Sequence, residues 1–176
     1  LSAKSASWEV NSFFEKYVNM VEAMALEPDI MAFVDENKTY DDIRGNENFQ
    51  PMVGYIKDLA ENSEEIMSTW VADIGANAAI ISTGDVTEKG FDITQREWYA
   101  CVETGKYILT EPYMDEITKT PVVTIATPIE KNGQVLGIVG VDVSLGEVSA
   151  AMQNHTIGNQ GFSVLLSTAG NVVYAP

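Results

Sequence analysis

The sequence contains a single cysteine, a single histidine and only two arginines, and each scarcity removes a class of function. Because Cys101 is alone, an intrachain disulfide and the zinc sites built from several cysteines are excluded. His155 is also alone, which excludes the HExxH motif and every metal site that needs two histidines. No Gly-x-Ser-x-Gly, P-loop or Cys-x-x-Cys motif occurs, so nothing indicates an enzyme, and we expect neither a cofactor nor a metal.

Positive charge is scarce as well, since 10 Lys and Arg residues stand against 26 Asp and Glu, for a formal net charge of −16 at pH 7. Such a surface repels phosphate backbones, which argues strongly against nucleic acid as a partner. No apolar run approaches the roughly 18 residues of a membrane-spanning helix. The chain begins at Leu1 without a methionine, so we expect a segment of a longer protein whose membrane helices lie outside it.

The 176 residues suffice for one domain with a hydrophobic core and the start of another. Apolar residues recur at helical spacing over 8–26, which predicts a long N-terminal helix. Pro28 stands where a second helix can begin, and 51–59 predicts a third. Shorter helices are predicted over 95–104, ending at Gly105, and after a capping box that starts at Ser144.

Four apolar runs are typical of strands, namely 66–74, 78–82, 121–130 and 134–143. A long helix followed by mostly antiparallel strands predicts an α+β fold with helices packed on one sheet. We expect three parts: a helix and connection over 1–49, a ligand-binding module over 50–153, and the start of a second, similar unit over 154–176. This last part repeats the strand–turn–strand pattern around Ala169-Gly170.

Asn132-Gly133 joins the third and fourth of these strands, and Asn-Gly between two apolar runs predicts a hairpin with a type I′ turn. That turn sets Lys131 opposite Gln134. Counting back along both strands predicts that Thr127 lies opposite Ile138 and that Val123 lies opposite Asp142.

The segment 91–99, FDITQREWY, holds the first candidate ligand-binding residue. Thr94 and Glu97 fit a capping box, which would place Arg96 in the first turn of a helix, with Ile93 and Trp98 as a hydrophobic staple. A cation there opposes the helix dipole unless an anion, such as a ligand carboxylate, binds the guanidinium and the exposed N–H groups together. The spacing equally allows Arg96 to pair with a surface acid while Trp98 fills the core.

Asp142 is the second candidate, because it stands near the end of an otherwise apolar strand. An ionised carboxylate in such a run is costly unless it is paired, and a ligand ammonium is a suitable partner. The alternative is a strand-end aspartate that faces water or accepts from backbone N–H groups. Tyr113 and Asp115 share side-chain parity in an extended segment, so both are able to accept from the same ammonium, or else to lie in a surface loop.

Together these residues would form a bipolar pocket, which is the chemical profile of a free α-amino acid. Arg96 and Tyr99 would take a carboxylate, whereas Asp142, Tyr113 and Asp115 would take an amine. Phe91 and Trp98 would form an apolar wall. Periodicity alone does not bring these groups together in space.

The runs FDITQREWY and EPYMD, followed by the hairpin TPVVTIATPI…NGQVLGIVGVDVSL, resemble the double Cache sensor domain of bacterial chemoreceptors and sensor histidine kinases. The resemblance implies a PAS-like antiparallel sheet as the membrane-distal module over 50–153 and the start of a membrane-proximal module over 154–176. It also implies an extracytoplasmic location and a homodimer formed through the N-terminal helix. The output domain stays open between chemotaxis, kinase and cyclic-dinucleotide signalling.

The resemblance is to the amino-acid-binding subgroup of that family, which implies roles for individual residues. Arg96, Trp98 and Tyr99 are expected to hold the ligand carboxylate, Tyr113 and Asp142 its amino group, and Asp115 an accessory position. Phe91 stands where the family usually has tyrosine, so the aromatic wall remains while one hydroxyl contact is lost. Two alternatives remain open: an interaction or dimerisation module without a small ligand, and a sensor of another small carboxylate or amine.

Overall fold

The computed structural model describes residues 3–115, 119–153, 165–166 and 172–174. It confirms the predicted α+β class, with one six-stranded antiparallel sheet in the order β2-β1-β6-β5-β3 and with β4 also paired to β5. The strands are β1 (Ile66–Asp73), β2 (Ala78–Ile81), β3 (Ile108–Leu109), β4 (Tyr113–Met114), β5 (Pro121–Lys131) and β6 (Gln134–Ser144). All four predicted apolar runs are therefore strands.

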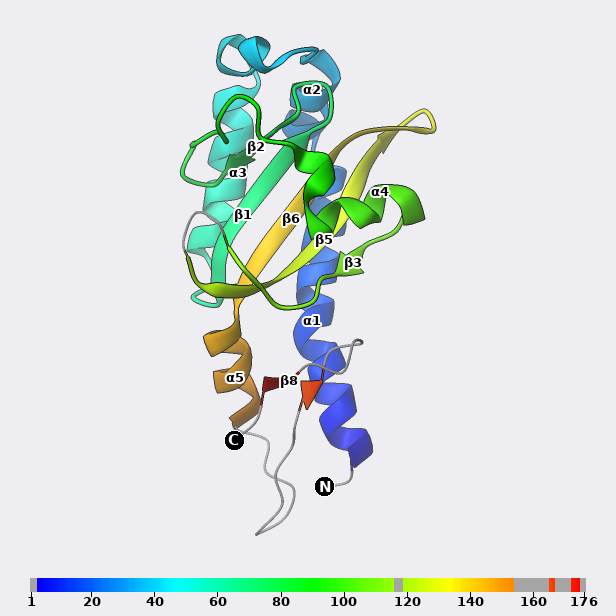
Figure 1. Ribbon diagram of the computed structural model, residues 1–176, viewed down its shortest axis with the longest axis vertical. Coiled ribbons are helices and arrows are strands. Elements are labelled where there is room, and N and C mark those ends of the chain that lie inside the picture. The colour runs from blue at the N-terminus through cyan, green and yellow to red at the C-terminus, as the bar shows by residue number, and fades with distance from the viewer. Residues whose placement is uncertain (1–2, 116–118, 154–164, 167–171, 175–176) are drawn as a thin grey trace.

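Helices cover one face of this sheet, and Figure 1 shows the long blue helix α1 running behind it. They are α1 (Ala3–Ala25), α2 (Pro28–Glu36) and α3 (Phe49–Glu61). The 3-10 helix η1 (Tyr40–Gly45) connects α2 to α3, and α5 (Leu145–Gln153) continues beyond the end of β6 (Figure 1). Pro28 occupies the first turn of α2, as predicted. The main core lies between these helices and the sheet, where Tyr17, Phe33 and Ile56 pack with Val71 and Val141.

Among the described residues, the other face of the sheet carries short elements, which Figure 1 shows in green in front of the strands. These are η2 (Ile93–Gln95), η3 (Glu97–Tyr99) and α4 (Ala100–Thr104), which ends at Gly105 with a φ of 63°. Side chains alternate between the two faces along each strand, so Val71 joins the main core while Trp70 joins a second cluster with Trp98 and Cys101. Three buried members of this second cluster, Trp70, Ala79 and Trp98, line the candidate site.

The β5–β6 hairpin has the predicted turn, since Asn132 and Gly133 both have positive φ, of 53° and 77°. Lys131 pairs with Gln134 as predicted, but farther along the two strands the predicted register is wrong by one residue. Ile129 pairs with Gly137 and Glu130 with Val135, so β6 contains one additional residue at a β-bulge. A bulge leaves no simple sequence signal, and its effect is carried along the rest of the ladder.

The corrected register sets the residue that faces the candidate aspartate. Thr124, and not Val123, lies opposite Asp142, and Val139, not Ile138, lies opposite Thr127. Beyond this hairpin, α5 begins as predicted, with the backbone N–H of Glu147 donating to Oγ of Ser144 over 3.0 Å.

A second hairpin is present where the repeat of the strand–turn–strand pattern predicts one. Strand β7 (Leu165–Leu166) pairs antiparallel with β8 (Val172–Tyr174). The remainder of the segment 154–176, including His155, lies outside the described residues.

Candidate functional site

A cavity of about 780 Å³ lies on the face of the sheet away from the long helices. Its floor is built from β1, β2 and β6, and its walls come from the segment 85–91, from the η2–η3 region and from β4. The lining residues are Ser68, Trp70, Ala79, Ile81, Asp85, Val86, Thr87, Glu88, Lys89, Gly90, Phe91, Arg96, Trp98, Tyr113, Asp115 and Asp142.

Two tryptophans form the apolar wall of this cavity. Trp70 lies directly opposite Gly140 on β6, and a Cβ atom at that glycine would overlap the indole ring. The absence of a side chain at Gly140 therefore lets Trp70 lie close against the neighbouring strand. Trp98 packs on it from η3, with the ring centroids 4.6 Å apart.

The local structure around Arg96 differs from the prediction. Asp92, not Thr94, is the cap: its carboxylate accepts from the backbone N–H of Thr94 over 3.0 Å and from the Thr94 hydroxyl over 2.7 Å. Arg96 itself is extended, with φ −89° and ψ 142°, and separates η2 from η3. The predicted continuous helix over 95–104 and the predicted first-turn position of Arg96 are both wrong, because the aspartate two residues earlier provides an equally good cap.

Arg96 nevertheless lines the cavity, so the correction removes the helix dipole from the argument but not the guanidinium. The guanidinium carbon lies 5.5 Å from the centre of the Phe91 ring. That distance is within the range of a cation–π contact, which holds the guanidinium beside the aromatic wall.

Asp142 is almost completely buried, with 4% of its surface exposed, and it faces side chains rather than water. Its Oδ1 accepts from the Thr124 hydroxyl over 2.6 Å and its Oδ2 accepts from the Ser68 hydroxyl over 2.7 Å. Burial raises the pKa of this carboxyl above the usual range of aspartate, and the hydrogen bonds from the side chains of Thr124, Ser68 and Trp70 oppose that rise. The two alternatives left by the sequence, a water-facing carboxylate and one bound to backbone N–H groups, are not what the structure has.

Tyr113 is connected to the same carboxylate through Thr124. Its hydroxyl lies 2.6 Å from the Thr124 hydroxyl, which in turn donates its one proton to Asp142. With Asp142 ionised, the Tyr113 hydroxyl must therefore donate to Thr124, and its own oxygen is left to accept. Burial, followed by the nearby charge of Asp142, raises the pKa of Tyr113, so the phenol stays protonated.

Six of the seven candidate residues line this one cavity: Phe91, Arg96, Trp98, Tyr113, Asp115 and Asp142. Tyr99 is not among the lining residues; it is half-buried and packs against the second hydrophobic cluster. The sequence pattern did not indicate Ser68, Trp70 or Thr124. A strand parity count would have placed Ser68 and Trp70 on one face, but Thr124 depends on the bulge.

The candidate residues therefore bring a guanidinium, two carboxyl groups, a tyrosine oxygen and an aromatic wall to one cavity, whose lining also includes Asp85, Glu88 and Lys89. Such a set is able to pair with a small molecule that carries both an anionic and a cationic group. Within the part of the chain that the structure describes, no helix has the length and apolar character that crossing a bilayer requires.

Comparisons with known proteins identify the class to which this arrangement belongs. Residues 36–150 match the family model described as the methyl-accepting chemotaxis protein-like, first PDC sensor domain. Because the match covers more than half of the chain, the chain belongs to this family of chemoreceptor sensor domains. The PAS-like fold and the sensor class expected from the sequence are confirmed.

Curated relatives include the methyl-accepting chemotaxis proteins TlpB of Bacillus subtilis, 42% identical over 88 residues, and PctB of Pseudomonas aeruginosa, 37% identical over 87 residues. Each alignment covers 49% of this chain but only 12% and 14% of those proteins, so the chain spans a small part of their length. The ligand-binding domain of the Pseudomonas fluorescens chemoreceptor CtaA, solved with L-serine, has a TM-score of 0.76 at 19% identity. That alignment covers 98% of this chain and 68% of that structure.

Proposed function

We propose that this chain senses a free α-amino acid, or a related amine-bearing carboxylate, on the extracytoplasmic side of a bacterial chemoreceptor. The observation that carries the proposal is the bipolar cavity, in which the Arg96 guanidinium and the buried Asp142 carboxyl line the same space. Similar domains solved with amino acids in place, such as CtaA with L-serine and the Pseudomonas aeruginosa receptor PctB with L-Arg, agree with this chemistry.

In the proposed complex, the ligand carboxylate binds the Arg96 guanidinium, and the ligand ammonium binds the acidic end of the cavity. There Asp142 supplies the negative charge, the Tyr113 oxygen accepts a hydrogen bond, and Asp115 adds a second carboxylate. Phe91 and Trp98 hold the ligand between aromatic surfaces. Tyr99 would support η3 from behind rather than contact the ligand, because it packs with the second cluster.

We further propose that the described sheet is the membrane-distal module of a two-module sensor and that the receptor dimerises through α1. Helix α1 packs on β5 and β6. A ligand that binds one conformation of the sheet more tightly than another would therefore shift α1, and α1 would move the membrane helix attached to it.

Isothermal titration of the purified chain with each standard L-amino acid tests the ligand assignment. We expect at least one to bind, and we expect Arg96→Ala to weaken that binding roughly 30-fold or more, because a charge-assisted pair is lost. Lys57→Ala, which removes a cation from the exposed face of α3, is the matched control and should bind as the unmodified chain does. Undiminished binding by Arg96→Ala would refute the assignment.

If no amino acid binds, the chain is better described as an interaction module. Sedimentation measurements with and without the panel then distinguish the two functions. A dimer whose stability is indifferent to every added ligand would favour the dimerisation alternative.

A further inference from the structure

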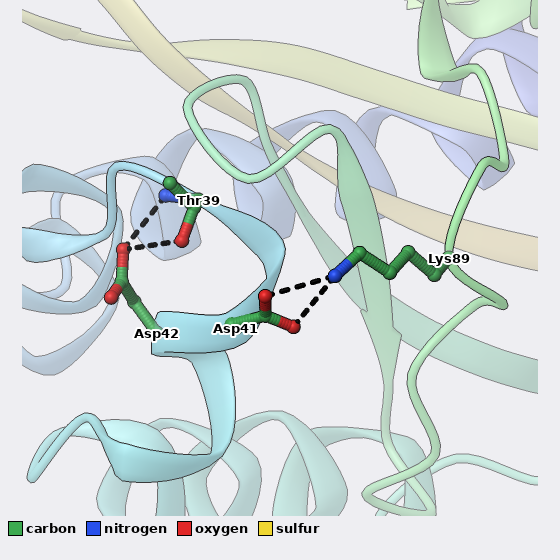
Figure 2. A network of polar contacts seen from close by, with 4 residues as sticks. All are labelled: Thr39, Asp41, Asp42 and Lys89. Carbon is green, nitrogen blue, oxygen red and sulfur yellow. Dashed lines mark hydrogen bonds and ion pairs between the residues drawn. The ribbon is translucent and has the colours of Figure 1, made fainter.

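The loop over 83–90 closes the cavity on the side away from Asp142, and it contains the second cation of the lining, Lys89. Figure 2 shows that the Lys89 ammonium does not stand alone: it is held by both oxygens of Asp41 on η1, at 2.9 Å each. The neighbouring Asp42 carboxylate points the other way in the same view, toward Thr39. Asp41 is not a lining residue, so Lys89 forms its ion pair with a group outside the cavity.

Two further contacts attach this loop to η1 and so keep Lys89 close to Asp41. The Tyr40 hydroxyl donates to the carbonyl oxygen of Thr87 over 2.7 Å. The Arg44 guanidinium donates to the carbonyl oxygen of Gly84 over 3.0 Å and also stacks on the Phe49 ring at 4.8 Å. The loop is therefore held at both of its ends by the same short helix.

The charges that remain on the loop are negative. Asp85 and Glu88 are both exposed and both line the cavity. In the proposed complex, the ligand carboxylate is balanced by Arg96 and its ammonium by Asp142 and Asp115. Lys89 is paired with Asp41, so in the proposed complex both cations of the lining are engaged by groups other than Asp85 and Glu88.

The strand spacing of the sheet sets the distance between these two carboxylates and the proposed amine site. The loop runs beside β2, where Val86 bridges Ile80, and β1 and β6 follow in order. Three strand spacings of about 4.8 Å place the loop backbone roughly 14 Å from β6, which carries Asp142. Because residues at both positions line the same cavity, this separation suits a ligand with an extended side chain.

We propose, on the basis of the proposed function, that the cavity selects an amino acid whose side chain is long and cationic, and that Asp41 determines this specificity by holding Lys89. The ligand's side-chain cation would bind Asp85 and Glu88 at the loop, while its amino-acid head binds Arg96 and Asp142. If Asp41 released Lys89, that ammonium would compete for the same two carboxylates and would repel the cationic side chain.

L-arginine and L-citrulline are the probes, because they have nearly the same shape and differ in side-chain charge. In calorimetric titration of the purified chain, we expect L-arginine to bind about three- to tenfold more tightly, the size of effect that exposed ion pairs give. The difference should shrink as salt is added, because exposed charges are screened. Asp85→Asn combined with Glu88→Gln should bring the affinity for L-arginine toward that for L-citrulline.

Asp41→Asn tests the role of the residue outside the cavity. We expect this variant to reduce the ratio of the affinity for L-arginine to that for L-citrulline about two- to fivefold, which is the effect of one exposed ion pair. Glu61→Gln is the matched control, since it removes one carboxylate from a similarly exposed ion pair, with Lys57 on α3, and should leave the ratio unchanged.

The outcomes separate this inference from the function on which it rests. Equal or tighter binding of L-citrulline would overturn the inference while leaving amino-acid sensing intact. Binding of small amino acids without binding of either probe would do the same. A wild-type ratio in Asp41→Asn would remove Asp41 from the explanation, and failure of every amino acid to bind would remove the proposed function as well.

Discussion

Thr124 lies directly opposite Asp142 on the neighbouring strand and donates its hydroxyl proton to that buried carboxylate over 2.6 Å. The same hydroxyl lies 2.6 Å from the hydroxyl of Tyr113. One threonine thus connects the two residues proposed to hold the ligand amine, although it does not line the cavity. It is best described as a positioning residue.

Thr124→Val removes this connection with little change of shape. We expect binding of the preferred amino acid to weaken about tenfold, and the free energy of unfolding to fall by about 1–3 kcal/mol, because Asp142 and Tyr113 each lose a buried partner. Calorimetric titration and urea denaturation measure the two effects. Thr127→Val makes the same change at another buried threonine of β5 and is the control for strand effects; equal losses in both variants would contradict the positioning role.

The raised pKa of Asp142 predicts how affinity depends on pH. Because burial favours the protonated carboxyl, Asp142 loses its charge as the pH falls through a value above the usual aspartate range. Ligand affinity should therefore fall on acidification at pH values where an exposed aspartate, whose pKa is about 3.9, is still mostly ionised. Asp142→Asn should bind weakly throughout this range, with no such decline.

The same shift has the opposite effect on the stability of the unliganded chain. The folded state binds the Asp142 proton more tightly than the unfolded state does, so its contribution to stability is largest at low pH and decreases as the pH rises through the raised pKa. Comparing the free energy of unfolding of the parent chain and Asp142→Asn across pH isolates this contribution. The expected sign would be wrong if the advantage of the parent chain over the variant grew with rising pH.

The sequence was sufficient for the parts of the fold that depend on local chemistry. Helical spacing located α1, Pro28 marked the start of α2, and Asn132-Gly133 gave the hairpin turn. It was not sufficient where a single residue changes the register of two strands or the start of a helix. The bulge near Ile129 shifted the register of β5 against β6, and two competing caps near Arg96 gave the wrong helix start.

The candidate site could be predicted only in part, for a related reason. Residues such as Arg96 and Asp142 were conspicuous because their charge contradicts their surroundings in the sequence. Ser68 and Thr124 carry no charge and fit an ordinary strand, so only the three-dimensional register shows that both donate to the carboxylate. The fixing of Lys89 by Asp41 joins residues 48 positions apart and has no local signal at all.

A buried polar network on the opposite face should govern stability without affecting the ligand. The Asn37 side chain donates to Oδ2 of Asp73 over 2.8 Å and accepts from Asn46 over 2.9 Å, and Asn37 is only 2% exposed. Asn37→Ala should lower the free energy of unfolding by about 1–3 kcal/mol, because the buried Asp73 carboxyl loses a donor. Denaturation measures this loss, and exposed Asn62→Ala should cost clearly less; a change of ligand affinity in Asn37→Ala would mean that the two faces are coupled.

The close approach of Trp70 to Gly140 gives the most direct test of the cavity wall. In Gly140→Ala, the added methyl group would overlap the indole ring, so Trp70, which also packs on Trp98, must shift from its position. We expect ligand binding to weaken about tenfold or more and tryptophan fluorescence to change, because a displaced ring occupies part of the cavity and forces strain elsewhere. Gly54→Ala is the matched control: it lies within α3 with nothing within 4 Å of the added atom, so alanine should stabilise the helix by about 0.5–1 kcal/mol. The same glycine-to-alanine change is therefore expected to raise stability at position 54 and to disrupt the packing of Trp70 at position 140. If the Gly140→Ala chain binds the ligand as tightly as its parent does, Trp70 is not part of the ligand-binding wall.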